Sequence, residues 1–266
     1  MTMGTIGLIG AGRLAGALVA GWIAADADCA ARIIATDRYE GVAEALASHY
    51  GIGVRATPAA VAAEADLVIL LVKPQDIAGA VAEVATMLHG GAAVASAAAG
   101  VELATIRAAF AAETPVARFM PNIPVAVCGG VSAVCGDQAA THVLVPWLEA
   151  VGMVVEMEES MFDAATAISG SGPGMIAYLI EAFTEAGMAV GFSADDAGRL
   201  ATMTFAGTGR YLVETGESAT ALRERVTSPG GTTAAGIAML DQLQVSEAIR
   251  AAAIAARDRG VELRGI

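Results

Sequence analysis

The chain has 266 residues, of which 56% are hydrophobic and 16% are charged. This length exceeds one typical domain, and the composition excludes a disordered chain because enough apolar surface is present to offset the conformational entropy of folding. The formal net charge of -13, from 28 acidic and 15 basic residues, argues against nucleic acid or an anionic membrane as a partner, since such a surface repels both.

The first part of the chain alternates short β-branched runs with alanine-rich helical stretches. The predicted strands cover residues 5–9, 32–36, 67–72, 92–98, 116–120, 131–135 and 153–157. This rhythm predicts an α/β fold with a parallel, doubly wound sheet. Residues 67–72, LVILLV, are apolar at every position, which predicts a central strand covered on both faces.

The last part of the chain has no strand signals. The predicted helices cover residues 174–190, 194–214, 219–226, 233–243 and 246–263. We therefore expect an α/β domain over residues 1–160 and an all-helical domain over residues 161–266. Small residues recur at helical spacing at Gly187 and Gly191 and at Ala182 and Ala186. This pattern fits either tight packing within one protomer or close helix contact across a dimer.

A glycine-rich motif follows the first predicted strand. Residues 10–15, Gly-Ala-Gly-Arg-Leu-Ala, form G-x-G-x-x-A between a strand and a helix. Gly10 permits a tight turn, Gly12 lets the backbone approach a pyrophosphate, and the helix N-terminus offers N–H groups to the anion. With a strand before it and a helix after it, the motif predicts a Rossmann-like dinucleotide site.

The second predicted strand ends at two charged residues that favour different cofactors. Asp37 is suited to the ribose diol of NAD, whereas Arg38 is suited to the 2′-phosphate of NADP. The residues alone leave this choice open. Lys73, Pro74 and Gln75 follow the central strand at the sheet edge where open α/β sheets bind ligands, so they are expected near the cofactor.

Metal, disulfide and membrane functions are not predicted. The three cysteines, Cys29, Cys128 and Cys135, show no C-x-x-C spacing and are expected to be small buried hydrophobic residues. The three histidines lie far apart, so no metal site is expected. The N-terminal segment lacks the features of a secretory signal, and the most apolar later stretch carries Glu181 and Glu185. A cytoplasmic protein with no membrane partner is therefore expected.

Six ordered motifs together resemble the pyrroline-5-carboxylate reductase family over nearly the whole chain. They are GAGRLA at 10–15, VKPQ at 72–75, SAAAGV at 96–101, MPNIPVAVCGGVSA at 120–133, AISGSGPG at 167–174 and TSPGGTTAAGIAMLDQ at 227–242. The departures are Arg13 and Asp37, where the family more often has Asn, and Gly174, where Ala is frequent. The first two bear only on cofactor affinity and choice.

The resemblance implies a site for each reactant. It implies that NADP(H), with NAD(H) as the alternative, is bound by Gly10, Ala11, Gly12, Arg13, Leu14, Asp37, Arg38, Val72, Lys73, Pro74, Ala98, Ala99, Gly100, Met120 and Pro121. It implies that the imino acid substrate is bound by Asn122, Ser228, Gly230, Gly231, Thr232 and Thr233. Read from the residues alone, the turn at 228–233 is either a carboxylate cradle at a helix N-terminus or an ordinary Ser/Thr-capped helix start.

The expected reaction is hydride transfer from the reduced nicotinamide to a cyclic imine carbon, which yields L-proline. The resemblance implies that the Thr233 hydroxyl orients the ring nitrogen. Residues 161–266 contain no His and no Lys, so the substrate is expected to bind already as the iminium. The alternatives are a reductase of another cyclic imino acid and a non-catalytic NAD(P)-binding sensor. A β-hydroxyacid dehydrogenase is disfavoured because it needs a lysine in the helical domain. A homodimer or a ring of dimers is expected, as in the family.

Overall fold

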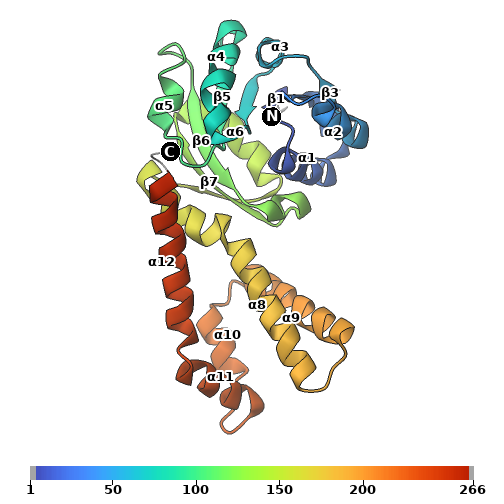
Figure 1. Cartoon of the computed structure of the whole chain (residues 1–266), viewed down its shortest axis with the longest axis vertical. Helices are drawn as coiled ribbons and strands as arrows, with labels where there is room; N and C mark the ends of the chain where they lie inside the picture. Colours follow the sequence, from blue (N-terminus) through green and yellow to red (C-terminus); the bar gives the residue numbers. More distant parts are fainter. Residues whose placement is uncertain (1–3, 264–266) are drawn as a thin grey trace. The chain divides into compact units, whose positions relative to one another are not determined.

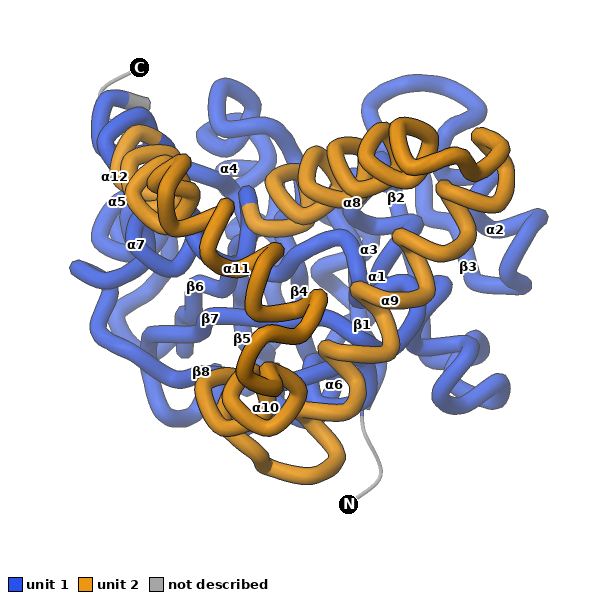
Figure 2. The backbone as a smooth tube through the Cα atoms, turned by 90° about the horizontal axis from the view of Figure 1, so that it is seen from below, with its two compact units in different colours: residues 1–171, 256–266 blue, residues 172–255 orange. Residues whose placement is uncertain are grey.

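The computed structural model describes residues 4–263 and divides the chain into two compact units (Figure 1, Figure 2). Unit 1 comprises residues 1–171 and 256–266, and unit 2 comprises residues 172–255. The predicted domain boundary at residue 160 therefore lies within unit 1, and the end of the last helix is counted with unit 1 as well. The binding role of each domain stays a prediction.

Unit 1 is built on one eight-stranded sheet of order β3-β2-β1-β4-β5-β6-β7-β8. The strands are β1 (Ile6–Ile9), β2 (Ile33–Thr36), β3 (Gly53–Val54), β4 (Leu67–Leu70), β5 (Ala93–Ser96), β6 (Val116–Pro121), β7 (Gly130–Gly136) and β8 (Gly152–Glu156). All seven predicted strands are present, and the short edge strand β3 is additional. β4 lies between β1 and β5 and is buried along its whole length, as predicted for a central strand.

The sheet is mixed, whereas an entirely parallel sheet was predicted. β6 and β7 are antiparallel, and the other pairs of neighbouring strands are parallel. Parallel neighbours need a crossover of a dozen or more residues, whereas antiparallel neighbours can be joined directly. The connection between β6 and β7 contains only the 3₁₀ turn η3 (Ile123–Val127), which is too short for a crossover helix.

Helices cover both faces of this sheet. They are α1 (Arg13–Ala25), α2 (Val42–Tyr50), α3 (Pro58–Ala62), α4 (Ile77–Met87), α5 (Leu103–Arg107), α6 (Gln138–Glu149) and α7 (Phe162–Ala165). One apolar cluster joins α1 and α6 to the sheet, and another joins α3, α4 and α5 to it. Trp22 and Trp147 pack edge to face with ring centroids 5.1 Å apart, and Trp22 Nε1 donates to the Trp147 carbonyl over 2.6 Å. This buried pair fixes α1 against α6.

The chain leaves the sheet through a segment that runs back along β6, here called the return segment (residues 159–170). Because β8 is parallel to β7, it ends at the edge where β6 begins. The return segment contains η4 (Glu159–Met161), α7 and the π-helical turn η5 (Thr166–Gly170). Arg118 donates to Glu159 over 2.8 Å, and the Asn122 amide donates to the Ser169 carbonyl over 3.0 Å. The segment is thus tied to β6 and to the residue directly after it.

Unit 2 is helical, as predicted. It contains α8 (Gly172–Ala189), α9 (Ala194–Thr215), α10 (Ala219–Arg225), α11 (Thr232–Gln242) and the first part of α12 (Val245–Leu263). Phe183 of α8 and Phe205 of α9 pack edge to face at 5.1 Å. A Cβ added to Gly187 would lie 2.9 Å from the Cβ of Ala197. Gly187 therefore serves helix packing within the protomer, whereas Gly191 lies in the turn after α8 with φ +108°.

The cysteines differ in their environments. Cys29 is buried, Cys135 is half-buried and Cys128 is exposed. The prediction that all three are buried is wrong for Cys128, which ends the short connection η3 in a left-handed conformation with φ 55°. Within residues 4–263, no helix is long and apolar enough to cross a membrane, and no group of three or more side chains could hold a metal ion.

Candidate active site

The turn between β1 and α1 has the geometry of an anion cradle. Gly10 has φ +101°, and a Cβ added there would lie 3.0 Å from the backbone of Leu71, so only glycine fits this position. A Cβ added to Gly12 would meet no heavy atom within 4 Å. Gly12 is also the N-cap of α1, and no side chain of the described residues caps this helix start. The first N–H groups of α1 therefore remain available to a phosphate.

Asp37 is anchored beside this turn. Its Oδ2 accepts a hydrogen bond from the backbone N–H of Ala11 over 2.8 Å, and its Oδ1 accepts one from the N–H of Tyr39 over 2.9 Å. A carboxylate oxygen has two acceptor sites, so each can still accept a bond from a ribose hydroxyl. Asp37 thus holds the end of β2 to the glycine-rich turn and presents its charge at the same place.

Arg38 lies next to Asp37 but is turned toward other partners. Its guanidinium forms an ion pair with Asp76, donates to the Tyr39 hydroxyl over 2.7 Å and stacks over the Tyr39 ring at 4.8 Å. The hydrogen bond to Tyr39 and the charge of Asp76 raise the pKa of Arg38 above its usual value. The charge of Arg38 is therefore permanent, but it is partly balanced by Asp76.

These groups line one cavity of about 440 Å³ in unit 1. The predicted cofactor residues that line it are Gly10, Gly12, Asp37, Arg38, Val72 and Lys73. Sequence reasoning missed Tyr39 and Asp76, which also line it. The available signal was position: Tyr39 follows the charged pair at the end of β2, and Asp76 directly follows the Lys-Pro-Gln motif. The open glycine turn, the anchored carboxylate and the adjacent guanidinium fit a dinucleotide.

Five of the other predicted cofactor residues follow β5 or form the end of β6. The other four lie in or beside the cavity's own turns: Ala11, Arg13 and Leu14 in the glycine-rich turn and the start of α1, and Pro74 directly after Lys73. Ala98 is buried and Ala99 is exposed, and Gly100 adopts φ +74° in the turn after β5. Met120 and Pro121 are buried at the end of β6. Since β1, β2, β4, β5 and β6 run parallel, these turns and the glycine-rich turn share one edge of the sheet. The five residues after β5 and at the end of β6 do not line the 440 Å³ cavity.

Both ends of the Asn122 amide are hydrogen-bonded to backbone groups of unit 1. Its amide nitrogen donates to the Ser169 carbonyl over 3.0 Å, and its Oδ1 accepts from the Val131 N–H over 2.9 Å. The residue is 9% exposed. Its position therefore suits alignment of the Gly-Ser-Gly loop that follows Ser169, and direct substrate binding by Asn122 stays a prediction.

In unit 2, the predicted substrate turn opens α11. Gly230 has φ +73°, and Gly231 donates its N–H to the Ser228 carbonyl over 3.0 Å. A Cβ on Gly231 would lie 2.6 Å from the Ser228 Oγ, so the serine hydroxyl is folded against the start of the helix. The N-cap is Gly231, with no side-chain cap. The geometry therefore favours the anion cradle over the Ser/Thr-capped helix start, since the first N–H groups of α11 have no capping side chain.

Both threonines of this turn are exposed. Thr232 and Thr233 are the first two residues of α11, and neither hydroxyl is hydrogen-bonded to another group in the described part of the chain. Removing either hydroxyl would therefore break no bond within the protein. This property makes the pair suitable for testing direct contact with a substrate.

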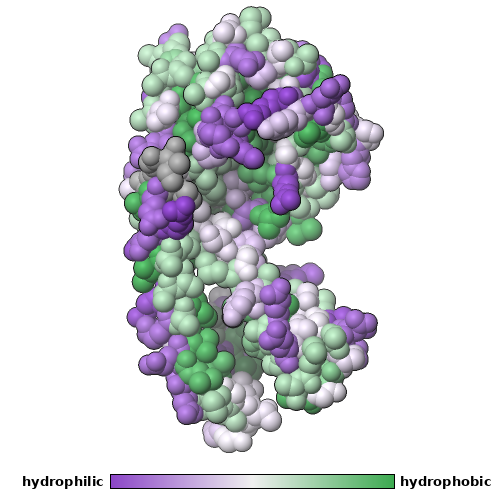
Figure 3. Space-filling view, viewed as in Figure 1, coloured by the Kyte–Doolittle hydropathy of each residue, from purple (hydrophilic) through white to green (hydrophobic). Residues whose placement is uncertain are grey.

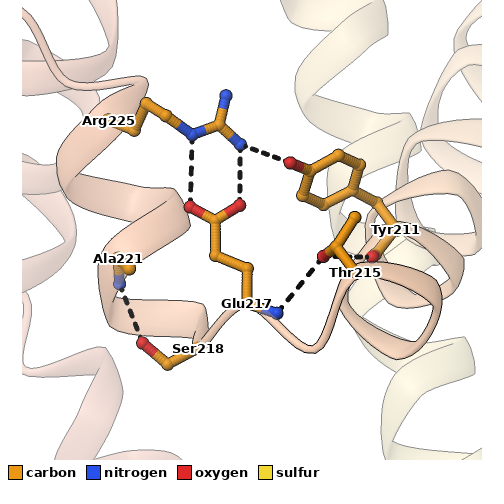
Figure 4. Close-up of polar contacts among 6 residues, drawn as sticks. All are labelled: Tyr211, Thr215, Glu217, Ser218, Ala221 and Arg225. Carbon is orange, nitrogen blue, oxygen red and sulfur yellow. Dashed lines mark hydrogen bonds and ion pairs between the residues drawn. The ribbon is translucent and has the colours of Figure 1, made fainter.

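An ion-pair cluster fixes the helix before the substrate turn (Figure 4). Arg225, the last residue of α10, donates to both carboxylate oxygens of Glu217 over 3.2 and 2.8 Å and to the Tyr211 hydroxyl of α9 over 2.9 Å. Thr215 accepts from the Glu217 N–H, and Ser218 caps α10. The cluster links the end of α9 to both ends of α10, three residues before Ser228.

Two family models match the chain. The model described as pyrroline-5-carboxylate reductase dimerisation matches residues 159–263, and the model described as NADP oxidoreductase, coenzyme F420-dependent, matches residues 5–100. The first match covers the part of the chain that the sequence predicts to be helical, and it includes the return segment and the turn at 228–233. The second match lies within the predicted α/β domain.

Relatives match nearly the full length. The chain is 38% identical to a pyrroline-5-carboxylate reductase from Corynebacterium melassecola over 98% of this chain and 99% of the relative. It is 37% identical to one from Methanosarcina acetivorans over 97% of each. The structure of a pyrroline-5-carboxylate reductase from Coxiella burnetii, 31% identical, superposes with a TM-score of 0.91 over 98% of this chain and 99% of the other.

Proposed function

Because this chain belongs to the pyrroline-5-carboxylate reductase family, we propose that it reduces the cyclic imine of 1-pyrroline-5-carboxylate to L-proline with NADPH. The observation that carries this function is similarity across both units, with 38% identity over 98% of the chain. The protein is thus an NADP-dependent oxidoreductase acting on a carbon–nitrogen bond, at the last step of proline biosynthesis. The family model that matches the first domain is itself that of an NADP oxidoreductase.

The cofactor is assigned to the sheet edge of unit 1. The glycine-rich turn at 10–12 and the start of α1 suit the pyrophosphate, and Asp37 and Arg38 suit the adenosine ribose. The turns after β4 and β5 and the end of β6 are assigned to the nicotinamide half. When bound, the reduced nicotinamide supplies the hydride.

The substrate is assigned to the turn at 228–233. The N–H groups of Thr232 and Thr233 hold the carboxylate, because they open a helix that no side chain caps. The N–H of Gly231, also predicted to bind it, already donates to the Ser228 carbonyl. Holding the carboxylate fixes the orientation of the ring and so aligns the imine carbon for reaction. The Thr233 hydroxyl accepts a hydrogen bond from the protonated ring nitrogen. The substrate thus binds as the iminium, since no His or Lys occurs in residues 161–266 to supply the proton.

The alternatives fit less well. A sensor without catalysis would have a broken substrate turn, whereas Ser-Pro-Gly-Gly-Thr-Thr is intact at 228–233. A β-hydroxyacid dehydrogenase needs a lysine in its helical domain, and Lys73 in the first domain is the single lysine of the chain. A reductase of another cyclic imino acid would use the same carboxylate and nitrogen contacts, and it is separated by the substrate assay.

The direct test measures oxidation of NADPH and of NADH by purified protein, with and without 1-pyrroline-5-carboxylate. We expect oxidation only when the imine is present, with proline as the product by amino-acid analysis. Piperideine carboxylate, one ring carbon larger, serves as the competing imine. Folded protein that turns over the larger ring but not the smaller one would redirect the function to another imino acid, and protein that turns over neither would refute it.

We also propose that the protein is a homodimer or a ring of dimers held by the helical domain. The match to a dimerisation model over residues 159–263 supports this assembly. The helices α8, α10 and α11 have no buried residue within the described chain. Figure 3 shows apolar side chains at the surface of this unit, where Met203, Val213 and Leu243 are 69%, 84% and 67% exposed. A monomer mass by light scattering at micromolar concentration would refute the dimer.

A cytoplasmic location is proposed from the thiols. Three free cysteines, with Cys128 exposed, are typical of a reducing compartment, because an exposed thiol is readily oxidised elsewhere. Fractionation of cells that express a tagged full-length chain tests this location. Recovery with the membrane or the secreted fraction would contradict it.

A further inference from the structure

The ion pair between Arg38 and Asp76 links the ends of two strands that are not neighbours. Arg38 follows β2 and Asp76 ends η2 (Pro74–Asp76), which follows β4. β1 lies between these strands in the sheet, so the pair spans the edge where the glycine-rich turn begins. Both residues line the 440 Å³ cavity. The pair is therefore part of the cofactor cavity.

Asp76 has no competing structural role for its carboxylate. It precedes α4 as the N-cap residue, but its side chain makes no capping hydrogen bond. Its backbone N–H donates to the Lys73 carbonyl over 2.9 Å, and this bond does not need the side chain. The carboxylate is 22% exposed and faces the Arg38 guanidinium.

Acidic side chains outnumber basic ones in the lining of this cavity. Its lining residues that are charged at neutral pH are Asp37, Asp76 and Glu83, which are acidic, and Arg38 and Lys73, which are basic. A phosphate on the ribose 2′ position adds about two negative charges, by analogy with other phosphate monoesters. The guanidinium of Arg38 is suited to bind it, but Asp76 already holds this group and repels the phosphate.

We propose that Asp76 is a specificity-determining residue, which competes with the cofactor 2′-phosphate for Arg38 and so keeps NADH usable beside NADPH. This inference rests on the cofactor assignment in the proposed function. Removing the Asp76 charge should strengthen binding of the 2′-phosphorylated cofactor and leave the other cofactor nearly unaffected, because NAD(H) carries only hydroxyls at this position.

The experiment compares binding of NADP⁺ and NAD⁺ to the intact protein by calorimetry, without substrate. For Asp76→Asn, we expect the NADP⁺ Kd to fall roughly 3- to 20-fold at low salt, with less change at high salt because the interaction is screened. The NAD⁺ Kd should change by less than about 2-fold, which is the size expected from a change in surface charge alone. The ratio of kcat/KM for NADPH over NADH should rise in parallel.

Two further variants separate this mechanism from a general charge effect. Glu83→Gln removes another negative charge from the same cavity without touching Arg38, and it should change the ratio much less. Arg38→Met should abolish the gain, so that adding Asp76→Asn to it has no further effect on NADP⁺. An unchanged ratio of the two Kd values in Asp76→Asn, or an equal gain in the Arg38→Met background, would overturn the inference.

The outcome is distinguishable from failure of the proposed function. If the cofactors bind as expected but 1-pyrroline-5-carboxylate is not reduced, the substrate assignment fails and the role of Asp76 stands. If the protein binds neither nucleotide, the cofactor assignment and the role of Asp76 fail together.

Discussion

Replacing Thr233 with valine tests the hydroxyl that is assigned to the ring nitrogen. Valine keeps the branched shape and the backbone N–H, so the carboxylate cradle is preserved. The Thr233 hydroxyl is exposed and bonds to no other described group, so its loss carries no penalty within the protein. The whole effect is then the lost bond to a charged iminium, worth about 1.5 to 3 kcal/mol, which predicts a kcat/KM roughly 10- to 150-fold lower.

The assay compares initial rates with 1-pyrroline-5-carboxylate for the wild type, Thr233→Val and Thr232→Val. Thr232 is the matched control because it lies in the same helical turn, is also exposed and loses the same hydroxyl. We expect Thr232→Val to remain near the wild-type rate and the NADPH Kd to be unchanged in both variants. If the Thr233→Val enzyme keeps more than about half of the wild-type kcat/KM, the Thr233 hydroxyl does not orient the ring nitrogen and the residue only begins the helix.

Three further predictions test the framework and the thiols. Glu217→Gln should loosen the end of α10 and raise the KM for the imine without changing the NADPH KM. Glu214→Gln, which breaks a surface ion pair within α9, should leave both KM values unchanged, and equal effects of the two variants would refute the positioning role of Glu217. Asn122→Ala leaves two partly buried backbone groups without this partner and should lower the free energy of unfolding by about 1 to 3 kcal/mol, so an unchanged denaturant midpoint would contradict it. A single equivalent of iodoacetamide at mildly alkaline pH should label Cys128, as read by peptide mass spectrometry. Burial and the nearby Glu159 raise the pKa of Cys135 to about 11, so this thiol stays protonated and slow to react, and preferential labelling of Cys135 would refute this assignment.

The fold was predictable where local patterns are long. The apolar run at 67–72 predicted the central strand β4, and the five helices after residue 171 start and end within about two residues of their predicted limits. β3 was not predictable because Gly53 and Val54 are too few to show alternation. The direction of β7 depends on the length of the connection after β6. The pattern of strand-forming residues does not indicate that direction.

The site was predictable in its glycine motifs and not in its side-chain pairing. Gly10 and Gly12 belong to a pattern whose backbone demands are visible in the sequence. The partner of Arg38 is Asp76, 38 residues away along the chain, and only the fold brings them together. Motif position also could not show that both ends of the Asn122 amide are bonded within the chain.

The two contacts of the return segment fix the number of residues between Glu159 and Ser169. Arg118 on β6 and Asn122, the residue after β6, are four residues apart, about 13 Å at the rise of a strand. Glu159 and Ser169 are ten residues apart, about 15 Å at the rise of a helix, so the two ties span comparable distances. Deleting one residue between Glu159 and Ser169 would rotate the second contact by about 100° around the helix axis. An insertion or deletion in this stretch therefore separates the two contacts, whereas substitutions that keep Glu159 leave both in place, because the second contact uses the Ser169 backbone carbonyl.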